Sequence, residues 1–262
     1  MAITLRSRRE IELMRKAGAV VSDVLLKLKE IAEPGMTTAR LDSIALQMTA
    51  DAGAEALFKG VRNPSARYPF PGAICASINE QVVHGIPSED TKLSNGDILS
   101  IDFGVRLNGY CADSAITTAI GEISESRRRL MEVTEHVLEI AIEKSAPAVK
   151  WSQVAAEMQQ YAESAGFSVV KDYVGHGIGR KMHEEPRVPN FVSDELVAND
   201  IVLAEGMVLA IEPMINSGTS AVRTLQNGWT VVTRDGKPSA HFEHTIVISS
   251  NGCEILTVKG NK

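Results

Sequence analysis

The chain carries the same strand pattern twice, and this internal repeat limits the folds that it can adopt. Residues 96–102 read Gly-Asp-Ile-Leu-Ser-Ile-Asp and residues 206–212 read Gly-Met-Val-Leu-Ala-Ile-Glu, so each apolar strand ends in a carboxylate. A second strand follows in each half, and there Asp113 aligns with Glu243. A His-Gly-Ile triplet precedes each set. Two half-domains related by a pseudo-twofold axis would bring four acidic side chains and two imidazoles to one central cleft.

The helical parts repeat in the same order. Apolar residues at helical spacing predict one helix from a capping box at Ser7 to just before Pro34, and another over residues 38–52. Two further helices are expected over residues 130–142 and 152–165. Each half is therefore expected to contain two helices followed by strands.

Segments with strand patterns fill the rest of the chain. They are residues 73–78, 97–105, 110–119, 168–173, 207–211, 231–233 and 242–249. Asn108-Gly109, Asn227-Gly228 and Asp235-Gly236 predict type I′ hairpin turns, which need positive φ at both central residues. Hairpins imply a largely antiparallel sheet.

The predicted fold class is α+β, with a curved, largely antiparallel central sheet and the helices on its outer face. An internal repeat in a chain of 262 residues favours a single domain over residues 1–262, made of two packed halves. The halves are expected to span about residues 1–121 and 122–262, with the connection at residues 121–125.

Composition excludes several classes of protein. Hydrophobic residues make up 44% and charged residues 23%, as in folded globular proteins, and the net charge of -6 argues against nucleic acid as the main partner. Three cysteines without a CxxC pair suit free thiols in a reducing compartment. Neither a signal peptide nor a membrane-spanning run is present, so a cytoplasmic location is expected.

The first hairpin brings two aspartates together. If residues 108–109 form a two-residue loop, Asp113 falls opposite Gly104, and Asp102 lies one diagonal step away on the same face. Diagonal neighbours in a sheet are about 7 to 8 Å apart, a separation that suits two carboxylates sharing metal ions about 3.5 to 4 Å apart. Adjacent buried carboxylates repel each other, and cations are their natural partners.

An aspartate at the end of a strand is usually a turn cap or a solvated charge. Here both carboxylate-bearing strands are flanked by apolar residues, and the pattern occurs in both halves, which favours a buried metal centre. Four carboxylates and one strong histidine candidate form a hard, oxygen-rich site that suits Mn, Fe, Co or Zn in a bridged pair. Such a pair activates water for hydrolysis, and no phosphate-binding loop accompanies the cluster.

The sequence resembles the type I methionine aminopeptidases, which have the pita-bread fold, over almost its whole length. The motifs that carry the resemblance are residues 77–80 (Ser-Ile-Asn-Glu), 84–87 (His-Gly-Ile-Pro), 96–102, 175–180 (Gly-His-Gly-Ile-Gly-Arg), 183–186 (His-Glu-Glu-Pro), 211–213 (Ile-Glu-Pro), 227–229 (Asn-Gly-Trp) and 242–245 (Phe-Glu-His-Thr). The resemblance implies two divalent metal ions. Their implied ligands are Asp102, Asp113, His176, Glu212 and Glu243, of which Asp113 and Glu243 bridge both ions.

The resemblance also implies roles for other residues. Glu212 would shuttle the proton of the attacking water, while His84 and His183 would donate hydrogen bonds to the substrate and the developing oxyanion. A pocket for the methionine side chain is implied near Phe70, Cys75, His84 and Trp229. A site for a monovalent cation is implied at Asn79, Gln81 and Ser239.

Three features depart from the family pattern. Met182 stands where an aromatic residue commonly precedes the substrate-binding histidine, and His241 replaces a common glutamine. The loop over residues 59–69 is longer than usual. These departures leave the metal ligands intact and bear on the shape of the pocket.

The implied activity is that of a methionyl aminopeptidase, a metal-dependent exopeptidase that removes the N-terminal methionine from nascent proteins and peptides with a small second residue. A bacterial-type monomer acting in transient association with ribosomes is expected. A proline-specific peptidase of the same fold is the first alternative; those relatives carry a large N-terminal domain and lack the Asn-Gly-Trp element. A non-enzymatic binding relative is the second alternative, but it would show substituted ligands and a basic surface.

Overall fold

A nine-stranded sheet forms the centre of the molecule in this computed structural model, which describes residues 3–258. Its members are β1 (Glu55–Ala56), β2 (Cys75–Ile78), β4 (Ile98–Leu107), β5 (Tyr110–Ala119), β7 (Gly175–Gly177), β8 (Glu184–Val188), β9 (Val208–Ile211), β14 (Glu243–Ser249) and β15 (Gly252–Ile255). The strand order is β1-β4-β5-β14-β9-β7-β8, with β2 paired to β4 and β15 paired to β14. Each of these pairings is antiparallel, as the sequence predicts.

Two small three-stranded sheets flank the central sheet. One has the order β13-β10-β6 and the other β11-β12-β3. Their strands are β3 (Gln81–Val83), β6 (Ser168–Val169), β10 (Met214–Asn216), β11 (Val222–Thr224), β12 (Val231–Thr233) and β13 (Ser239–His241). Residues 168–173, predicted as one strand, form only the two-residue β6, because the chain then turns toward the central cleft.

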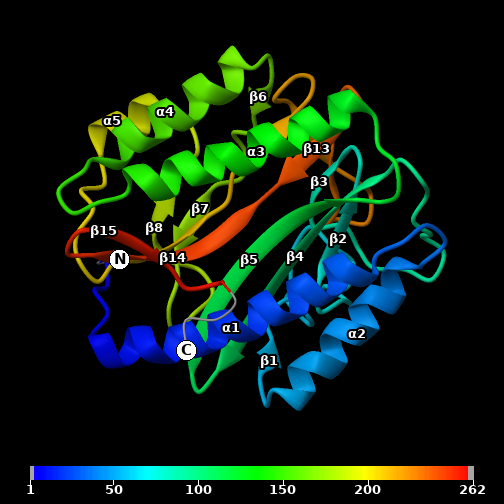
Figure 1. Cartoon of the computed structure of the whole chain (residues 1–262), viewed down its shortest axis with the longest axis horizontal. Coiled ribbons are helices and arrows are strands. Elements are labelled where there is room, and N and C mark those ends of the chain that lie inside the picture. Colours follow the sequence, from blue (N-terminus) through cyan, green and yellow to red (C-terminus); the bar gives the residue numbers. More distant parts are fainter. Residues whose placement is uncertain (1–2, 259–262) are drawn as a thin grey trace.

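Two pairs of helices cover the sheet. They are α1 (Arg8–Ile31) with α2 (Thr38–Asp51), and α3 (Glu125–Lys144) with α4 (Trp151–Ser164); the short α5 (Asp194–Ala198) follows in the second half. The predicted capping box at Ser7 is present and starts α1. Figure 1 shows α1 and α2 along one half of the curved sheet and α3 and α4 along the other. Two helices before the strands of each half is the predicted order.

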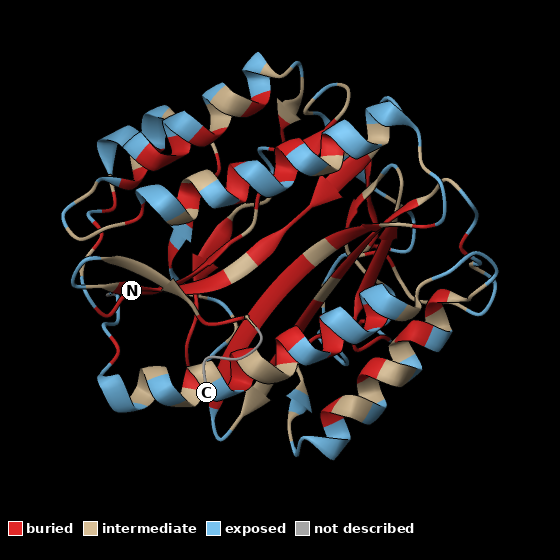
Figure 2. Cartoon of the chain, in the orientation of Figure 1, coloured by how far each residue is buried: buried red, intermediate tan, exposed pale blue. Residues whose placement is uncertain are grey.

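Each helix pair packs an apolar stripe against its own half of the sheet. Leu25 and Leu41 belong to one buried cluster with Phe103 of β4, while Trp151 and Val137 belong to a second cluster with Leu209 of β9. Figure 2 shows the buried strands between helices whose outward surfaces are exposed. The burial of these stripes fixes the helices to one face and leaves the other face of the sheet for the cleft.

The pseudo-twofold axis passes between β5 and β14. These two strands join the halves, and Ser114 pairs with His244 in their ladder. Ser114 and His244 are also equivalent positions in the repeat, since Asp113 aligns with Glu243. An antiparallel pair of equivalent residues has the symmetry axis between its members, so Asp113 and Glu243 lie directly beside the axis.

Two of the three predicted turns lie in hairpins, and one of these has the predicted two-residue loop. Asn108 and Gly109 have φ of 52° and 82° and join β4 to β5. Asn227-Gly228 also lies in a hairpin, that of the antiparallel strands β11 and β12, but within the longer connection of residues 225–230; Asp235-Gly236 connects strands of two different sheets. The physical reason is side-chain capping: the Asn227 carboxamide and the Asp235 carboxylate accept backbone N–H bonds two residues ahead and stabilise other turns.

Gly18 of α1 tests the contact between this helix and the C-terminal part of the chain. A Cβ added there would lie 2.0 Å from the carbonyl oxygen of Leu256. We expect Gly18→Ala to lower the free energy of unfolding by about 1 to 3 kcal/mol, because overpacking outweighs the helix propensity gained. Thermal denaturation would measure the change, with exposed Lys16→Ala in the same helix as the control. A stabilised Gly18→Ala variant would contradict the close contact.

Candidate active site

The hairpin of β4 and β5 places two aspartates on the cleft face of the sheet. Gly104 pairs with Asp113 and Ala115 pairs with Asp102, which confirms the predicted register. The neighbours of Asp102 in β4, Ile101 and Phe103, point to the opposite face and are fully buried under the helices. The alternation of the strand therefore presents the carboxylates to the cleft and the apolar side chains to the core.

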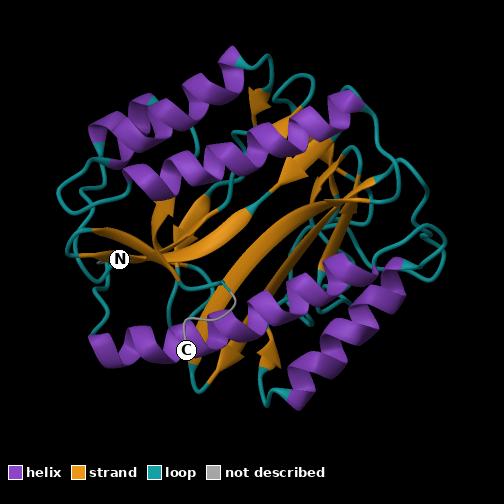
Figure 3. Cartoon of the chain, in the orientation of Figure 1, coloured by secondary structure: helices purple, strands orange, loops and turns teal. Residues whose placement is uncertain are grey.

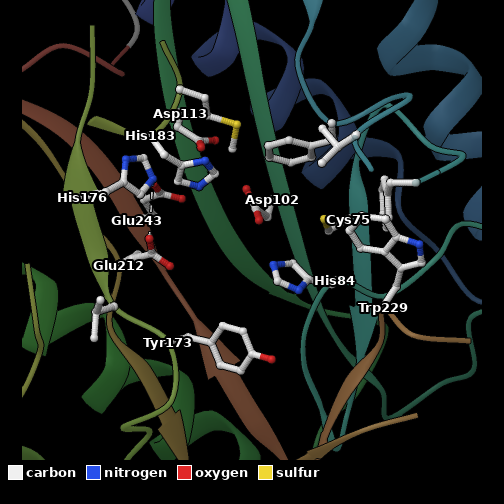
Figure 4. A pocket seen from close by; sticks show the side chains of 15 residues that line it. Cys75, His84, Asp102, Asp113, Tyr173, His176, His183, Glu212, Trp229 and Glu243 are labelled. Atoms are coloured by element: carbon white, nitrogen blue, oxygen red, sulfur yellow. Dashed lines mark ion pairs between the residues drawn. The ribbon is translucent and has the colours of Figure 1, made fainter. Parts of the chain in front are cut away.

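The second half supplies three more side chains. Glu212 follows β9, Glu243 begins β14, and His176 lies on β7, where it pairs with Ala210. Figure 4 shows these groups and the two aspartates directed toward one another. The Thr245 hydroxyl accepts a hydrogen bond from the Asp113 backbone N–H and donates one to the Asp113 carbonyl. These two bonds hold the two halves in register at this point.

The two His-Gly-Ile triplets reach the same cleft but are not symmetry equivalents. In the second half His176 pairs with Ala210, and the equivalent pair in the first half joins Ser77 to Ser100. His84 lies after β3, outside the central sheet, with φ of 59°. The two triplets therefore reach the cleft on different parts of the fold. The prediction that His84 and His176 are equivalent positions of the repeat is wrong.

The carboxylates and His176 form one tight cluster. Ligand atoms of Asp113, His176 and Glu243 lie within 4.8 Å of one another, and all three residues are buried. Glu212 adjoins them, since its Oε1 is 3.7 Å from His176 Nε2. The Nδ1 atom of His176 lies 2.9 Å from the Gly177 carbonyl, so Nε2 is directed at the cluster.

The acidic cluster is short of hydrogen-bond donors. Within residues 3–258, one buried oxygen each of Asp102, Asp113 and Glu243 has no hydrogen-bond partner. Burial raises the pKa of Asp113 from 3.8 to about 7, and burial together with neighbouring carboxylates raises the pKa of Glu243 well above its ordinary value. Buried oxygens without donors are costly to leave unpaired, and divalent cations satisfy them, so the residues fit a metal centre.

The imidazoles of the cleft are uncharged near neutral pH. Burial, followed by the nearby His183, lowers the pKa of His176 to about 4. The same two causes lower the pKa of His84 to about 4, and burial lowers that of His183. The rings of His176 and His183 pack edge to face with centroids 4.3 Å apart. A neutral imidazole can ligate a metal ion or donate one hydrogen bond without carrying charge.

An apolar cavity of about 260 Å³ opens beside the cluster. Phe58, Phe70 and Cys75 form its buried wall, and Trp229 packs on Phe70 with ring centroids 5.2 Å apart. Cys75 is a free thiol, and burial raises its pKa well above the ordinary value, so it contributes to the wall as a small apolar group. The predicted pocket residues Phe70, Cys75, His84 and Trp229 thus line the same cavity as the five acidic and imidazole groups.

Tyr173 and His241 have no predicted catalytic or binding role, yet both lie against predicted site residues. Tyr173 lines the cavity and packs edge to face on His84, with centroids 5.6 Å apart. His241 is buried, and its Nε2 lies 3.9 Å from Glu212 Oε2. The spacing of two residues between His241 and Glu243 could have indicated that His241 faces the cleft, because side chains two residues apart in an extended chain share a face.

The three departures from the family pattern also lie at this site. Met182 packs with the apolar wall, and His241 adjoins Glu212. The loop of residues 59–69 contributes Val61 to the cavity, and its Tyr68 carbonyl accepts a bond of 2.9 Å from Trp229 Nε1. The loop of residues 59–69 therefore supports the indole that lines one side of the pocket.

The proposed monovalent-cation residues are only partly gathered. The Ser239 N–H donates to the Asn79 carbonyl at 2.8 Å, which brings these two together. Gln81 Oε1 accepts the Ile78 N–H at 3.2 Å. The cation site at Asn79, Gln81 and Ser239 stays a prediction.

Comparison with known proteins identifies the family. The profile of metallopeptidase family M24 matches residues 12–250. A methionine aminopeptidase from Clostridium perfringens is 49% identical over 256 residues, which cover 98% of this chain and 99% of that protein. The chain belongs to the methionine aminopeptidases of family M24. Methionine aminopeptidase 1 from Bacillus subtilis is 44% identical over 97% of this chain and 99% of its own length.

Solved structures agree with this family and with the pita-bread fold. A methionine aminopeptidase from Thermotoga maritima superposes with a TM-score of 0.92 at 40% identity, covering 98% of this chain and all of that one (100%). Prolidase from Pyrococcus furiosus has a TM-score of 0.77 at 21% identity, and the match spans 66% of its length. The prolidase shares the fold, but the proline-specific alternative is the weaker one. Across the described residues, no helix is both long and apolar enough to cross a bilayer.

The raised pKa of Asp113 should make the stability of the metal-free protein depend on pH. A carboxyl whose pKa is raised on folding stabilises the protein below its unfolded pKa, and this stability is lost as pH rises through the folded pKa. For Asp113 this loss of stability should occur between pH 3.8 and about pH 7. Since each pKa unit corresponds to about 1.4 kcal/mol, the loss should be on the order of a few kcal/mol.

Asp113→Asn is the matched control, because it keeps the shape of the side chain and removes the titration. Thermal melts of chelated protein between pH 4 and 8 should show the wild type losing stability relative to this variant as pH rises. Saturating Mn²⁺ should remove the loss. Parallel curves for the wild type and Asp113→Asn would contradict the assigned cause.

Proposed function

We propose that this methionine aminopeptidase removes the N-terminal methionine of peptides and nascent proteins whose second residue is small. The observation that carries the proposal is the joining of a largely apolar pocket to a buried acidic cluster in one cavity. The pocket suits an unbranched apolar side chain, and the cluster suits hydrolysis of the bond beside it. Substrate would enter with its first side chain in the pocket and its scissile carbonyl at the cluster.

Five side chains would hold two divalent metal ions. They are Asp102, Asp113, His176, Glu212 and Glu243, and Asp113 and Glu243, which lie beside the pseudo-twofold axis, would be shared by both ions. The donor set of four carboxylates and one imidazole suits Co, Mn, Fe or Zn. When bound, the ions would polarise the scissile carbonyl and make water a better nucleophile at neutral pH.

Glu212 is the group suited to move the proton. Its carboxylate lies in the cleft beside the other acidic groups, and in the metal-free protein burial and the Asp113 charge raise its pKa well above the ordinary value. His176 Nε2 lies 3.7 Å from one oxygen and His241 Nε2 lies 3.9 Å from the other, which orients the carboxyl in the cleft. Glu212 would accept the proton of the attacking water and deliver it to the leaving amine.

His84 and His183 would bind the peptide from two sides of the cavity. Both line it, and burial lowers the pKa of each, so each can donate one hydrogen bond as a neutral ring. His183 lies against His176 and therefore close to the place of the carbonyl oxygen. We assign His84 to the peptide amide and His183 to the developing oxyanion.

The wider setting forms part of the same proposal. Residues 1–262 would act as one catalytic unit and as a monomer in the cytoplasm, where ribosomes supply nascent N-termini. A monovalent cation at Asn79, Gln81 and Ser239 would brace the turn that follows Ile78 at the end of β2.

Peptide specificity tests the proposed function. Met-Ala-Ser and Met-Gly peptides should have kcat/KM values at least about 10-fold above those of Met-Lys and Met-Leu peptides, because a site that selects a small second residue would exclude the larger side chains. The measurement is the release of free methionine by metal-loaded enzyme. Efficient cleavage of X-Pro peptides with poor cleavage of Met-Ala-Ser would instead support a proline-specific peptidase.

His183→Ala should lower kcat far more than it raises KM, because its hydrogen bond strengthens as charge develops on the oxygen. Loss of one oxyanion donor costs about 10² to 10³ in rate, and the metal ions favour the lower end of this range. Steady-state kinetics with Met-Ala-Ser measure the change, and metal content should match the wild type. A variant that loses metal would reveal a ligand, whereas a change in KM alone would reduce His183 to substrate binding.

A further inference from the structure

The loop that carries His183 needs an external support. It joins β7 to β8, and His183 lines the cavity from this loop with part of its surface open to solvent. Within residues 3–258, the His183 ring forms no hydrogen bond, and it packs on the ring of His176. The place of this imidazole therefore depends on the backbone of the loop.

The Glu184 carboxylate binds the backbone of this loop. Its Oε1 accepts the backbone N–H groups of Arg180 at 2.9 Å and Lys181 at 3.0 Å. Its Oε2 forms an ion pair with the guanidinium of Arg6, which comes from the segment before α1. One carboxylate thus connects the His183 loop to a distant part of the chain.

Arg6 is itself firmly placed. Only 5% of its side chain is exposed, and its backbone N–H donates to the Gly206 carbonyl at 2.7 Å. The Gly206 N–H in turn donates to Ile248 of β14 at 2.9 Å. The guanidinium also fills the space beside Gly179, where a Cβ would lie 1.9 Å from Nη2. Arg6 therefore ties the loop to the central sheet.

We propose that Arg6, acting through Glu184, is the positioning residue that holds the His183 loop in the geometry needed for catalysis. The inference rests on the donor role proposed for His183. A buried arginine and its partner could instead serve stability alone, so the test must separate the placement of His183 from folding. The segment before α1 becomes, on this account, part of the support of the active site.

Three variants perturb the contact in different ways. Arg6→Met removes the charge, Arg6→Lys keeps it, and Gly179→Ala displaces the guanidinium while both charges remain. Arg8→Met is the control, because Arg8 is exposed at the start of α1. Each variant is assayed with Met-Ala-Ser well below its own melting temperature, so that only folded enzyme is compared.

We expect Arg6→Met and Gly179→Ala to lower kcat by about 10-fold to 100-fold with little change in KM or metal content, because small misplacements of catalytic groups cost rates of this order. Arg6→Lys should recover part of the loss. In a His183→Ala background, Arg6→Met should have an effect of less than about twofold, because coupled residues are not additive. Independent, multiplicative losses would overturn the proposal.

Hydrogen exchange supplies a readout that does not depend on activity. The amides of Arg180 and Lys181 should exchange faster in Arg6→Met than in Arg8→Met, with or without metal. Unchanged exchange would overturn the inference alone. Unchanged kcat in His183→Ala would overturn the proposed role of His183, and with it the catalytic part of the inference.

Discussion

Repulsion among buried carboxylates is the constraint on which this site depends. The fold drives Asp102, Asp113, Glu212 and Glu243 into one cleft, and the oxygens left without donors there are costly in a folded protein. Protonation relieves part of the cost in the metal-free protein, and divalent cations relieve it in the working enzyme. The same crowding that raises these pKa values thus creates the affinity for metal.

The pseudo-twofold axis explains how the sequence produces that crowding. A pair of equivalent strands, β5 and β14, meets at the axis, so one acidic position per half becomes two adjacent carboxylates. The helices occupy the other face of the sheet and supply the apolar burial that stabilises the arrangement. The two halves then diverge: the first supplies the buried part of the apolar wall, Phe58, Phe70 and Cys75, and the second supplies His176 and His183.

The sequence could predict those features that depend on strand alternation and on short-range turn chemistry. The Asn108-Gly109 turn determined the register of β4 and β5, and with it the shared face of Asp102 and Asp113. Prediction failed where side chains cap the backbone, as at Asn227, or where similar motifs follow different paths, as at His84. The contact between Arg6 and Glu184 joins residues far apart in the chain, and no local pattern indicates it.

Calorimetric titration of chelated enzyme with Mn²⁺ at pH 7, in buffers of different ionisation enthalpy, tests the central claim most directly. The account predicts two bound ions per chain and a net release of protons, because the carboxyls beside the axis hold protons before metal binds. Glu243→Ala should abolish binding of at least one ion and part of the proton release. Metal binding without proton release, or full turnover by protein shown to be metal-free by elemental analysis, would contradict the account.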